Sequence, residues 1–421
     1  MHEADLDQLD DEQSDGEEDS DEFTADREAP DDATAIYVFK DHKQPVLRIC
    51  LSKLSNFAVS GGQDDMAHVW ETTTGRLLFS CPNHKDSVHC VGVSCKETFV
   101  VTADMSGLVQ VFKVPSGEKM FDYELDDVHW VQWHPLVNAV LVVGTESGSI
   151  WVFNVLDVNK IKTLQGSAAA TTIAKITSCG TKLMAGYEDG SVRLWDLKDS
   201  SILFAIKGLC LVLLSAIPAH SLKSLFLSDN LAHKSAVTCI DFQGEDEAIS
   251  ATGSTDGTVK LINLCSGKVL TSFACGVSAG GKAAHQSDAA MEGHDAEETG
   301  DEANSIETVA FCSVLQLLAT ATVRGVIEVW EVSSFRRRCN FVHEEGVSGI
   351  RWDLTDHTKV HSAGLDGYFN TWDGRDGKLL MQRLCHTDHI LDFDVKRGDE
   401  DDIVATASED ATCRVFHLNK Y

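Results

Sequence analysis

The chain has 421 residues, of which 35 are Lys or Arg and 66 are Asp or Glu, so its formal net charge is −31 at pH 7. Such a surface suits nucleic acid poorly, because binding there requires phosphates to be neutralised by Lys and Arg. A basic protein or peptide suits it better. One compact core stops growing near roughly 250–300 residues, so this length indicates several domains or a repeat.

Residues 1–34 form an acidic segment with 16 Asp or Glu and one Arg. Few apolar residues interrupt it, so it cannot bury enough surface to offset chain entropy. We therefore predict a disordered acidic tail over residues 1–34. The segment lacks the basic-then-apolar pattern of a secretory signal, and the 13 Cys include no CxxC pair. Reduced thiols and a cytoplasmic location are expected.

A repeat of about 42 residues follows the tail. Its marker is the large apolar residue that ends each VxVW-like strand, and the eight markers are Trp70, Phe112, Phe153, Trp195, Ile262, Trp330, Trp372 and Phe416. Successive markers lie 42, 41, 42, 67, 68, 42 and 44 residues apart. A unit of this length is typical of the four-stranded blade of a β-propeller. Residues 35–421 are therefore predicted to form one all-β domain, an eight-bladed propeller.

Two of the gaps exceed the repeat by about 25 residues each. Residues 277–304 are rich in Asp, Glu, Gly and Ala and are predicted to be a flexible acidic loop. Residues 209–230 read LCLVLLSAIPAHSLKSLFLSDN and lack strand alternation and turn signals. We interpret this apolar insertion as an isoform insert or a translated intron, with a partner-docking hairpin as the alternative. Pro218, His220 and Lys223 break the run, which argues against a membrane span.

The segment 233–264 shows how one repeat divides into strands. VTCIDF alternates as a first strand, AISATGS is a second, and TVKLINL is a third after the tight turn TDG. The chain finishes on a third strand, CRVFHL at 413–418, while an isolated strand, AIYVF, stands at 35–39. We predict that residues 35–39 supply the missing fourth strand of the last blade and close the ring, which removes two exposed edges.

Polar residues recur at fixed places in the repeat. An Asp lies six residues before the marker, a Ser or Thr four residues before that Asp, and a His about 23 residues before it. With a Trp marker, these residues can form a buried chain of hydrogen bonds, each worth about 1 kcal/mol net. Two repeats hold complete tetrads, which are His42, Ser60, Asp64 and Trp70, and His343, Ser362, Asp366 and Trp372. Three repeats have Ser106, Ser147 or Arg324 at the Asp position.

His, Ser and Asp also occur together in catalytic triads. An active site occurs once in a chain, whereas this set returns at a fixed period, and its Asp lies in a turn where it can pair with backbone N–H groups. His84 and His89 are assigned to strand structure, since side chains at that spacing point to opposite faces of a strand. We predict no catalytic residue, no enzyme activity, no metal and no cofactor.

The repeat resembles the WD-repeat family, and the Trp-Asp pair itself stands at 195–196 and 372–373. The resemblance covers residues 35–421. Segments such as SGGQDDMAHVW (60–70) and AGYEDGSVRLWDLK (185–198) are similar to one group of cytosolic eight-bladed adaptors in that family. This resemblance implies a role linked to cell migration and angiogenesis in vertebrates. It also implies a likeness to a fungal chaperone that holds a new, basic protein of the large ribosomal subunit.

Charge and resemblance favour one function. The tail holds −15 of the net charge and residues 282–302 hold −6, which leaves −10 on the propeller. We expect a chaperone or adaptor whose acidic propeller binds a basic ribosomal protein or basic peptide during large-subunit biogenesis. Asp65, Glu188 and Glu409, beside the turn Asp residues, are the predicted partner-binding residues.

Two other functions stay open. One is a cytosolic signalling adaptor in cell migration and angiogenesis, and the other is a substrate receptor of a ubiquitin ligase. The expected protein is a cytoplasmic monomer that reaches the nucleus or membranes through its partners, without a membrane span and without direct contact to nucleic acid.

Overall fold

A computed structural model describes residues 35–157, 159–208, 231–244, 247–276, 304–398 and 401–418. The predicted tail over residues 1–34 and the predicted apolar insertion over residues 209–230 lie outside these ranges. The predicted acidic loop 277–304 also lies outside them, apart from Asn304.

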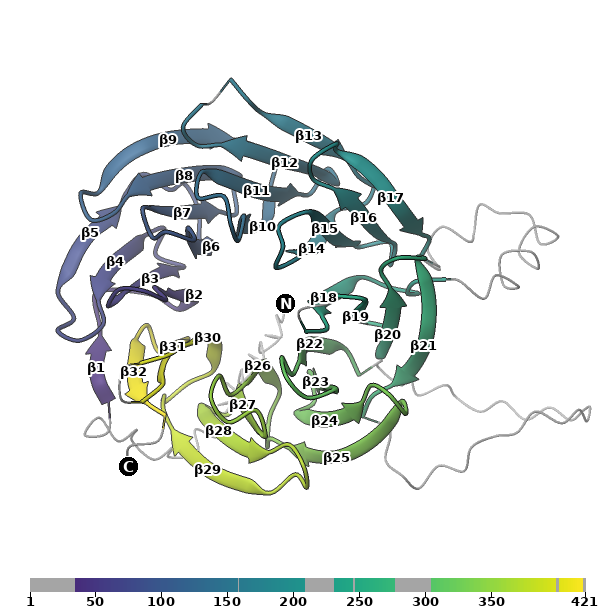
Figure 1. Cartoon of the computed structure of the whole chain (residues 1–421). Helices are drawn as coiled ribbons and strands as arrows, with labels where there is room; N and C mark the ends of the chain where they lie inside the picture. Colours follow the sequence, from purple (N-terminus) through teal and green to yellow (C-terminus); the bar gives the residue numbers. More distant parts are fainter. Residues whose placement is uncertain are drawn as a thin grey trace, which may run out of the picture.

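Within the described ranges, thirty-two β-strands form eight four-stranded antiparallel sheets. The sheets stand as blades in a ring (Figure 1), which confirms the predicted eight-bladed, all-β propeller. Each blade runs from an inner strand near the ring axis to an outer strand at the periphery. The chain then enters the inner strand of the next blade.

Blades 1 to 4 use their strands in chain order. Blade 1 consists of β2 (Val46–Leu51), β3 (Phe57–Gly62), β4 (Ala67–Glu71) and β5 (Leu77–Cys81). Blade 2 consists of β6 (Val88–Val93), β7 (Phe99–Asp104), β8 (Leu108–Lys113) and β9 (Glu118–Glu124). Blade 3 consists of β10 (Val128–Trp133), β11 (Val140–Thr145), β12 (Ser149–Asn154) and β13 (Lys162–Gln165). Blade 4 consists of β14 (Thr171–Ile176), β15 (Lys182–Tyr187), β16 (Val192–Asp196) and β17 (Ser201–Ile206).

Blades 5 to 7 follow the same order, and blade 8 takes its outer strand from the other end of the described chain. Blade 5 consists of β18 (Val237–Phe242), β19 (Ile249–Ser254), β20 (Thr258–Asn263) and β21 (Lys268–Ala274). Blade 6 consists of β22 (Ile306–Phe311), β23 (Leu317–Thr322), β24 (Val326–Glu331) and β25 (Arg336–Val342). Blade 7 consists of β26 (Val347–Trp352), β27 (Lys359–Gly364), β28 (Tyr368–Asp373) and β29 (Leu379–Leu384). Blade 8 consists of β30 (Ile390–Lys396), β31 (Ile403–Ser408), β32 (Cys413–His417) and β1 (Ala35–Phe39).

The pairing of β1 with β32 closes the ring. Phe39 lies opposite Cys413 and Ala35 opposite Phe416 in an antiparallel ladder, which confirms the prediction that residues 35–39 complete the last blade. Phe39 is 1% exposed, and its ring stacks on Trp70 of blade 1 at a centroid distance of 4.6 Å. The closing strand therefore pairs within blade 8 and also packs onto blade 1.

Burial falls from the middle of each blade toward its periphery. Every residue of β3, β7 and β23 is buried, because a second strand is covered by a neighbouring blade on each side. The outer strand β21 instead alternates exposed and half-buried residues along its length. The apolar clusters join residues of adjacent blades, for example Val192 of blade 4 with Val237 of blade 5. The core therefore lies between the blades, as in other repeat architectures.

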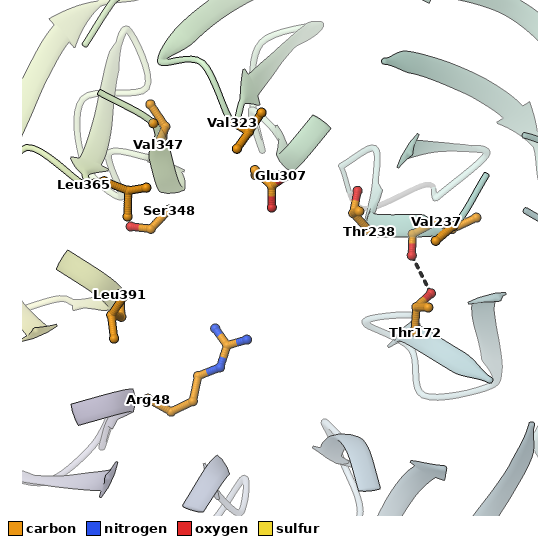
Figure 2. Close-up of a pocket in the computed structure, with 12 residues that line it drawn as sticks. Arg48, Thr172, Val237, Thr238, Glu307, Val323, Val347, Ser348, Leu365 and Leu391 are labelled. Carbon is orange, nitrogen blue, oxygen red and sulfur yellow. Dashed lines mark hydrogen bonds between the residues drawn. The ribbon is translucent and has the colours of Figure 1, made fainter. Parts of the chain in front are cut away.

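Hydroxyl side chains near the start of the inner strands link neighbouring blades. A β-bulge near the start of β14 and of β18 places one extra residue there. In blade 4 this residue is Thr172, whose hydroxyl donates to the Val237 carbonyl of blade 5, as Figure 2 shows. In blade 5 it is Thr238, whose hydroxyl donates to the Ile306 carbonyl of blade 6. The bulge therefore re-aims a polar side chain toward the next blade.

Carboxylates further along the inner strands make a second set of links. Asp241 of blade 5 accepts a 2.6 Å hydrogen bond from the Phe311 amide of blade 6. Asp394 of blade 8 likewise accepts from the Leu51 amide of blade 1 at 2.9 Å and from Lys53 Nζ at 2.8 Å. The seam between the last and first blades is therefore joined by the same kind of contact as an internal junction.

Candidate partner-binding face

The members of the first predicted tetrad lie within hydrogen-bonding distance in blade 1. Trp70 Nε1 donates to Ser60 Oγ at 3.2 Å, and Ser60 Oγ lies 2.9 Å from His42 Nε2. His42 Nδ1 lies 3.1 Å from an Asp64 oxygen. A neutral His42 with its proton on Nδ1 satisfies every bond, so the chain of donors runs from Trp70 through Ser60 and His42 to Asp64.

The second predicted tetrad has the same geometry in blade 7. Trp372 Nε1 donates to Ser362 Oγ at 2.8 Å, His343 Nε2 lies 2.7 Å from that oxygen, and His343 Nδ1 lies 3.0 Å from Asp366. Gly364 makes room for this arrangement, because a Cβ there would stand 2.2 Å from Asp366 Oδ1 and 2.5 Å from His343 Nδ1. A glycine between the hydroxyl and the Asp is therefore a steric requirement of the network.

Blade 2 keeps the carboxylate but moves it by two residues. His84 Nδ1 lies 3.0 Å from Asp104, which is fully buried, and Ser106 donates to the same carboxylate at 2.7 Å. Burial opposes ionisation of Asp104, yet the bonds from His84, the Lys85 amide and Ser106 hold its pKa well below the usual range. The spacing that placed Ser106 at the Asp position therefore missed the residue that does the pairing.

The turn carboxylates also fix one face of the propeller. This upper face consists of the turns between the second and third strands together with the connections from each outer strand to the next inner strand. Asp64 accepts from the Lys43 amide at 2.9 Å, and Asp256 accepts from the Lys234 amide at 2.8 Å. Each bond ties a turn to the connection beside it, so the upper face is held rigidly by side chains within its own blades.

The structure places all three predicted partner-binding residues on the upper face. Asp65, Glu188 and Glu409 are exposed and lie in turns of blades 1, 4 and 8, respectively. Asp65 has a positive φ of 58°. Glu409 lies 2.7 Å from His389 Nδ1. The three carboxylates share a face but lie on separate blades. A single ligand can therefore contact all three only if it extends across the ring.

Sequence reasoning missed most of the carboxylates on this face. The further exposed or half-buried ones in its connections and turns are Asp41, Asp86, Asp126, Asp127, Glu146, Glu344, Glu345 and Asp388. Together with Asp65, Glu188 and Glu409 they form an arc over blades 7, 8 and 1 to 4, which we name the acidic rim. The exposed basic residues of the same face lie on both sides of the ring: Lys40, Lys43 and Lys85 within the rim on blades 1 and 2, and Lys207, Lys234 and Arg324 in connections and turns of blades 5 and 6.

The most concentrated part of the acidic rim surrounds His389 between blades 7 and 8. Its Nδ1 lies 2.7 Å from Glu409 and 3.9 Å from Asp388, and its Nε2 lies 3.7 Å from Glu345. Three carboxylates thus converge on one imidazole directly before β30, the inner strand of blade 8. Such a group produces a locally negative potential on the upper face.

A cavity of about 490 Å³ opens at the centre of the upper face. Its wall includes Val323, Leu365 and Leu391, with Glu307 and Arg48 as its charged members. Figure 2 shows the Arg48 side chain reaching into the middle of this space from blade 1. Arg48 also lines a second cavity of about 660 Å³ further along the inner strands. The upper face therefore combines a charged rim with a partly apolar, hollow centre.

Two groups among the described residues bring three potential metal ligands together, namely Asp388 with His389 and Glu409, and His42 with Asp64 and His68. In the second group both nitrogens of His42 are already bonded within the blade, and His68 Nδ1 lies 2.9 Å from Ser80 Oγ. Burial lowers the pKa of His68 to about 4. The contacts of the blade itself thus account for this cluster.

Two known family profiles match parts of this chain. The profile of the WD domain, G-beta repeat matches residues 33–71 and 75–113, and the Vps8 beta-propeller profile matches residues 133–273. The angio-associated migratory cell protein of Homo sapiens is 32% identical over 394 residues, which is 93% of this chain and 82% of the relative. The chain belongs to the family of angio-associated migratory cell protein. The resemblance seen in the sequence is confirmed.

A fungal relative is more distant from this chain in sequence. The ribosome assembly protein SQT1 of Saccharomyces cerevisiae is 22% identical over 370 residues, which is 85% of this chain and 79% of the relative. The crystal structure of Saccharomyces cerevisiae Sqt1 superposes with a TM-score of 0.74 at 18% identity, covering 92% of this chain and 99% of that one. Sqt1 of Chaetomium thermophilum, bound to the N-terminus of the ribosomal protein L10, superposes with a TM-score of 0.73 at 19% identity, covering 91% and 100%. These structures share the fold.

The described part of this chain contains no helix long and apolar enough to cross a membrane.

Proposed function

We propose that this protein is a binding scaffold that holds a basic, extended segment of a large-subunit ribosomal protein on its acidic rim. The observation that carries the proposal is the arc of carboxylates over six of the eight blades. Complementary charge speeds encounter and fixes the register of a partner. The likeness to Sqt1, a ribosome assembly protein with a structure bound to the N-terminus of L10, supports this class of client.

The rigidity of the upper face supports the same proposal. Asp64 and its counterparts are held by bonds within their own blades, while Asp65, Glu188 and Glu409 are exposed. The turns that carry the exposed carboxylates are therefore held in place before binding, and mainly the side chains themselves lose conformational entropy when a partner binds. A basic segment lying across the ring would meet carboxylates at intervals, and masking its charge there would keep it from nucleic acid. We place this work in the cytoplasm.

The test uses charge reversal with a matched control. The variant Glu188→Lys with Glu409→Lys changes the rim, and Glu118→Lys with Asp199→Lys makes the same change in net charge among exposed residues on the opposite face. Affinity for a basic N-terminal peptide of the ribosomal protein is measured by fluorescence anisotropy at low and moderate salt. The rim variant should bind about tenfold more weakly, and the control within about twofold of the unaltered protein.

The salt series decides the mechanism. Binding by the unaltered protein should weaken steadily as salt rises, and the rim variant should show a shallower slope. Equal loss in the rim variant and the control would mean that net charge alone attracts the peptide. Salt-independent binding would overturn the charge-based proposal.

A second candidate is a signalling adaptor in cell migration. The 32% identity with angio-associated migratory cell protein favours it. Purification of the tagged protein from cytosol separates the candidates. A basic ribosomal protein that is lost as salt rises supports the chaperone, whereas receptor or GTPase-pathway proteins retained at moderate salt support the adaptor.

A further inference from the structure

The guanidinium of Arg48 is aimed into the central cavity of the upper face and is weakly engaged by the protein. Its side chain is 55% exposed, and the ion pair that it makes in the described part of the chain, with Asp392 Oδ1, spans 3.8 Å. The other oxygen of Asp392 accepts from the Ile49 amide at 3.1 Å. Figure 2 shows the guanidinium in open space, with Glu307 and Ser348 on the facing wall.

The walls around this cation are of two kinds. Val323, Leu365 and Leu391 supply branched aliphatic side chains, and Val323 is 43% exposed. Thr238 and Ser348 supply hydroxyls that already donate to backbone carbonyls, so their lone pairs remain as acceptors. The cavity therefore offers apolar surface, hydrogen-bond acceptors and one flat, delocalised cation.

Charge and desolvation disfavour charged and aliphatic side chains as occupants of the central cavity. A Lys or Arg of the partner could pair with Glu307 only by placing its charge beside the like charge of Arg48. An Asp or Glu would have to pass the acidic rim, where Glu345, Asp388 and Glu409 repel it. An aliphatic side chain would take water from the Arg48 guanidinium without giving it an acceptor, which costs free energy.

We infer that the central cavity is a receptor for one aromatic side chain of the partner, preferentially tyrosine, stacked on the Arg48 guanidinium. The ring face attracts the cation, the ring edges contact Leu365 and Leu391, and the hydroxyl donates to the carboxylate of Glu307. This inference rests on the proposed function for its ligand class, a basic segment. It adds that the segment carries a tyrosine between its cationic residues.

The experiment compares three labelled, arginine-rich heptapeptides that differ only in a central tyrosine, leucine or alanine. Binding is measured by fluorescence anisotropy to the full chain and to Arg48→Met, which keeps a long side chain and removes the charge. The unaltered protein should bind the tyrosine peptide about fivefold to tenfold more tightly than the alanine peptide, in line with a desolvated cation–π contact. Arg48→Met should bind the tyrosine and alanine peptides with nearly equal affinity.

Three results would overturn the inference. They are an equal tyrosine-to-alanine ratio in both proteins, equal binding of the leucine and tyrosine peptides by the unaltered protein, and tighter tyrosine binding by Arg48→Met. A thermal melt of Arg48→Met that matches the unaltered protein shows that a lost preference is not a lost fold.

A separate readout keeps the two proposals distinguishable. If none of the peptides binds at low salt, the proposed function fails. Saturation-transfer NMR with N-acetyl-tyrosinamide then tests the receptor by itself. Transfer from the full chain that disappears in Arg48→Met supports the receptor, and absence of transfer from the full chain overturns it.

Discussion

The Lys207 carbonyl accepts a 2.9 Å hydrogen bond from the Ala232 amide, although the apolar segment 209–230 separates these residues in the sequence. Between them the described chain has only Gly208 and Leu231. If these two were joined, the bond would be the one that closes a four-residue β-turn. A glycine in a central position suits such a turn. The two ends of the segment are therefore held together by the hydrogen bond that a short turn from blade 4 to blade 5 would make.

Joining Gly208 directly to Leu231 should leave the propeller folded and its stability within about 0.5 kcal/mol of the full chain, since the deletion removes no described contact. Urea unfolding followed by tryptophan fluorescence measures this. A longer deletion that also removes Lys207 and Ala232 is the control, and it should unfold at lower urea. An insoluble product from the shorter deletion would contradict the prediction.

The closing strand makes a second prediction. Phe39→Ala should lower the free energy of unfolding by about 3–5 kcal/mol, because the buried ring stacks on Trp70 and its loss leaves a cavity between blades 8 and 1. Lys40→Ala, at the exposed neighbouring residue, is the control and should cost less than about 0.5 kcal/mol. Chemical denaturation gives both values. Equal stability of the two variants would show that the ring closes without Phe39.

Asp410 makes stability depend on pH. Burial opposes its ionisation, but the hydrogen bond and charge of His386 and the bond from Thr412 lower its pKa from 3.8 to about 2. The stabilisation is therefore present above about pH 4 and is lost as the pH falls toward 2. Asp410→Asn should cost about 1–2 kcal/mol at pH 7, a typical value for a charged hydrogen bond. The difference in melting temperature from the unaltered protein should narrow below pH 4, and a constant difference would refute the linkage.

The exposed thiol of Cys179 should react with iodoacetamide faster than the buried thiol of Cys413. Cys179 is exposed, and hydrogen bonds with Thr177, then with the hydroxyl and amide of Thr181, lower its pKa. Cys413 is fully buried, and burial raises its pKa. Because the thiolate is the nucleophile, iodoacetamide should label Cys179 in the folded protein and Cys413 only after unfolding. Peptide mass spectrometry reads both sites, with Thr181→Val expected to slow labelling at Cys179 alone.

The repeat was predictable because the strand-end markers lie in the core between blades, where volume is tightly constrained. The position of Trp70 and its counterparts fixed the number of blades, and the unpaired strand at 35–39 fixed how the ring closes. Complete tetrads were predictable because a buried His needs hydrogen-bond partners for both of its nitrogens.

Substitutions within the network could not be predicted from spacing. In blade 4, Ser167 takes the place of the His and donates to Asp189 at 2.8 Å. In blade 6, Cys275 takes that place and lies 3.5 Å from Thr320 Oγ1. Several residue types fit these positions because each needs only one polar contact, so the composition of the sequence does not reveal the partner.

The side chains that line the interior of the ring could not be predicted from the sequence, for a different reason. Whether Arg48 points into the cavity depends on the register of β2 after its bulge, between Val46 and Arg48. A shift of one residue turns a strand side chain to the other face. The acidic rim was hidden similarly, because its members come from connections on six different blades and meet only once the ring has closed.

The pairing of β1 with β32 also constrains synthesis. Ribosomes make the N-terminus first, so Ala35–Phe39 leaves the exit tunnel long before Cys413–His417 exists. Until then β1 has no strand to pair with, and no finished blade 8 holds Phe39 against Trp70. A protein whose proposed client is itself a newly made chain therefore closes its own ring only after Cys413–His417 has been made.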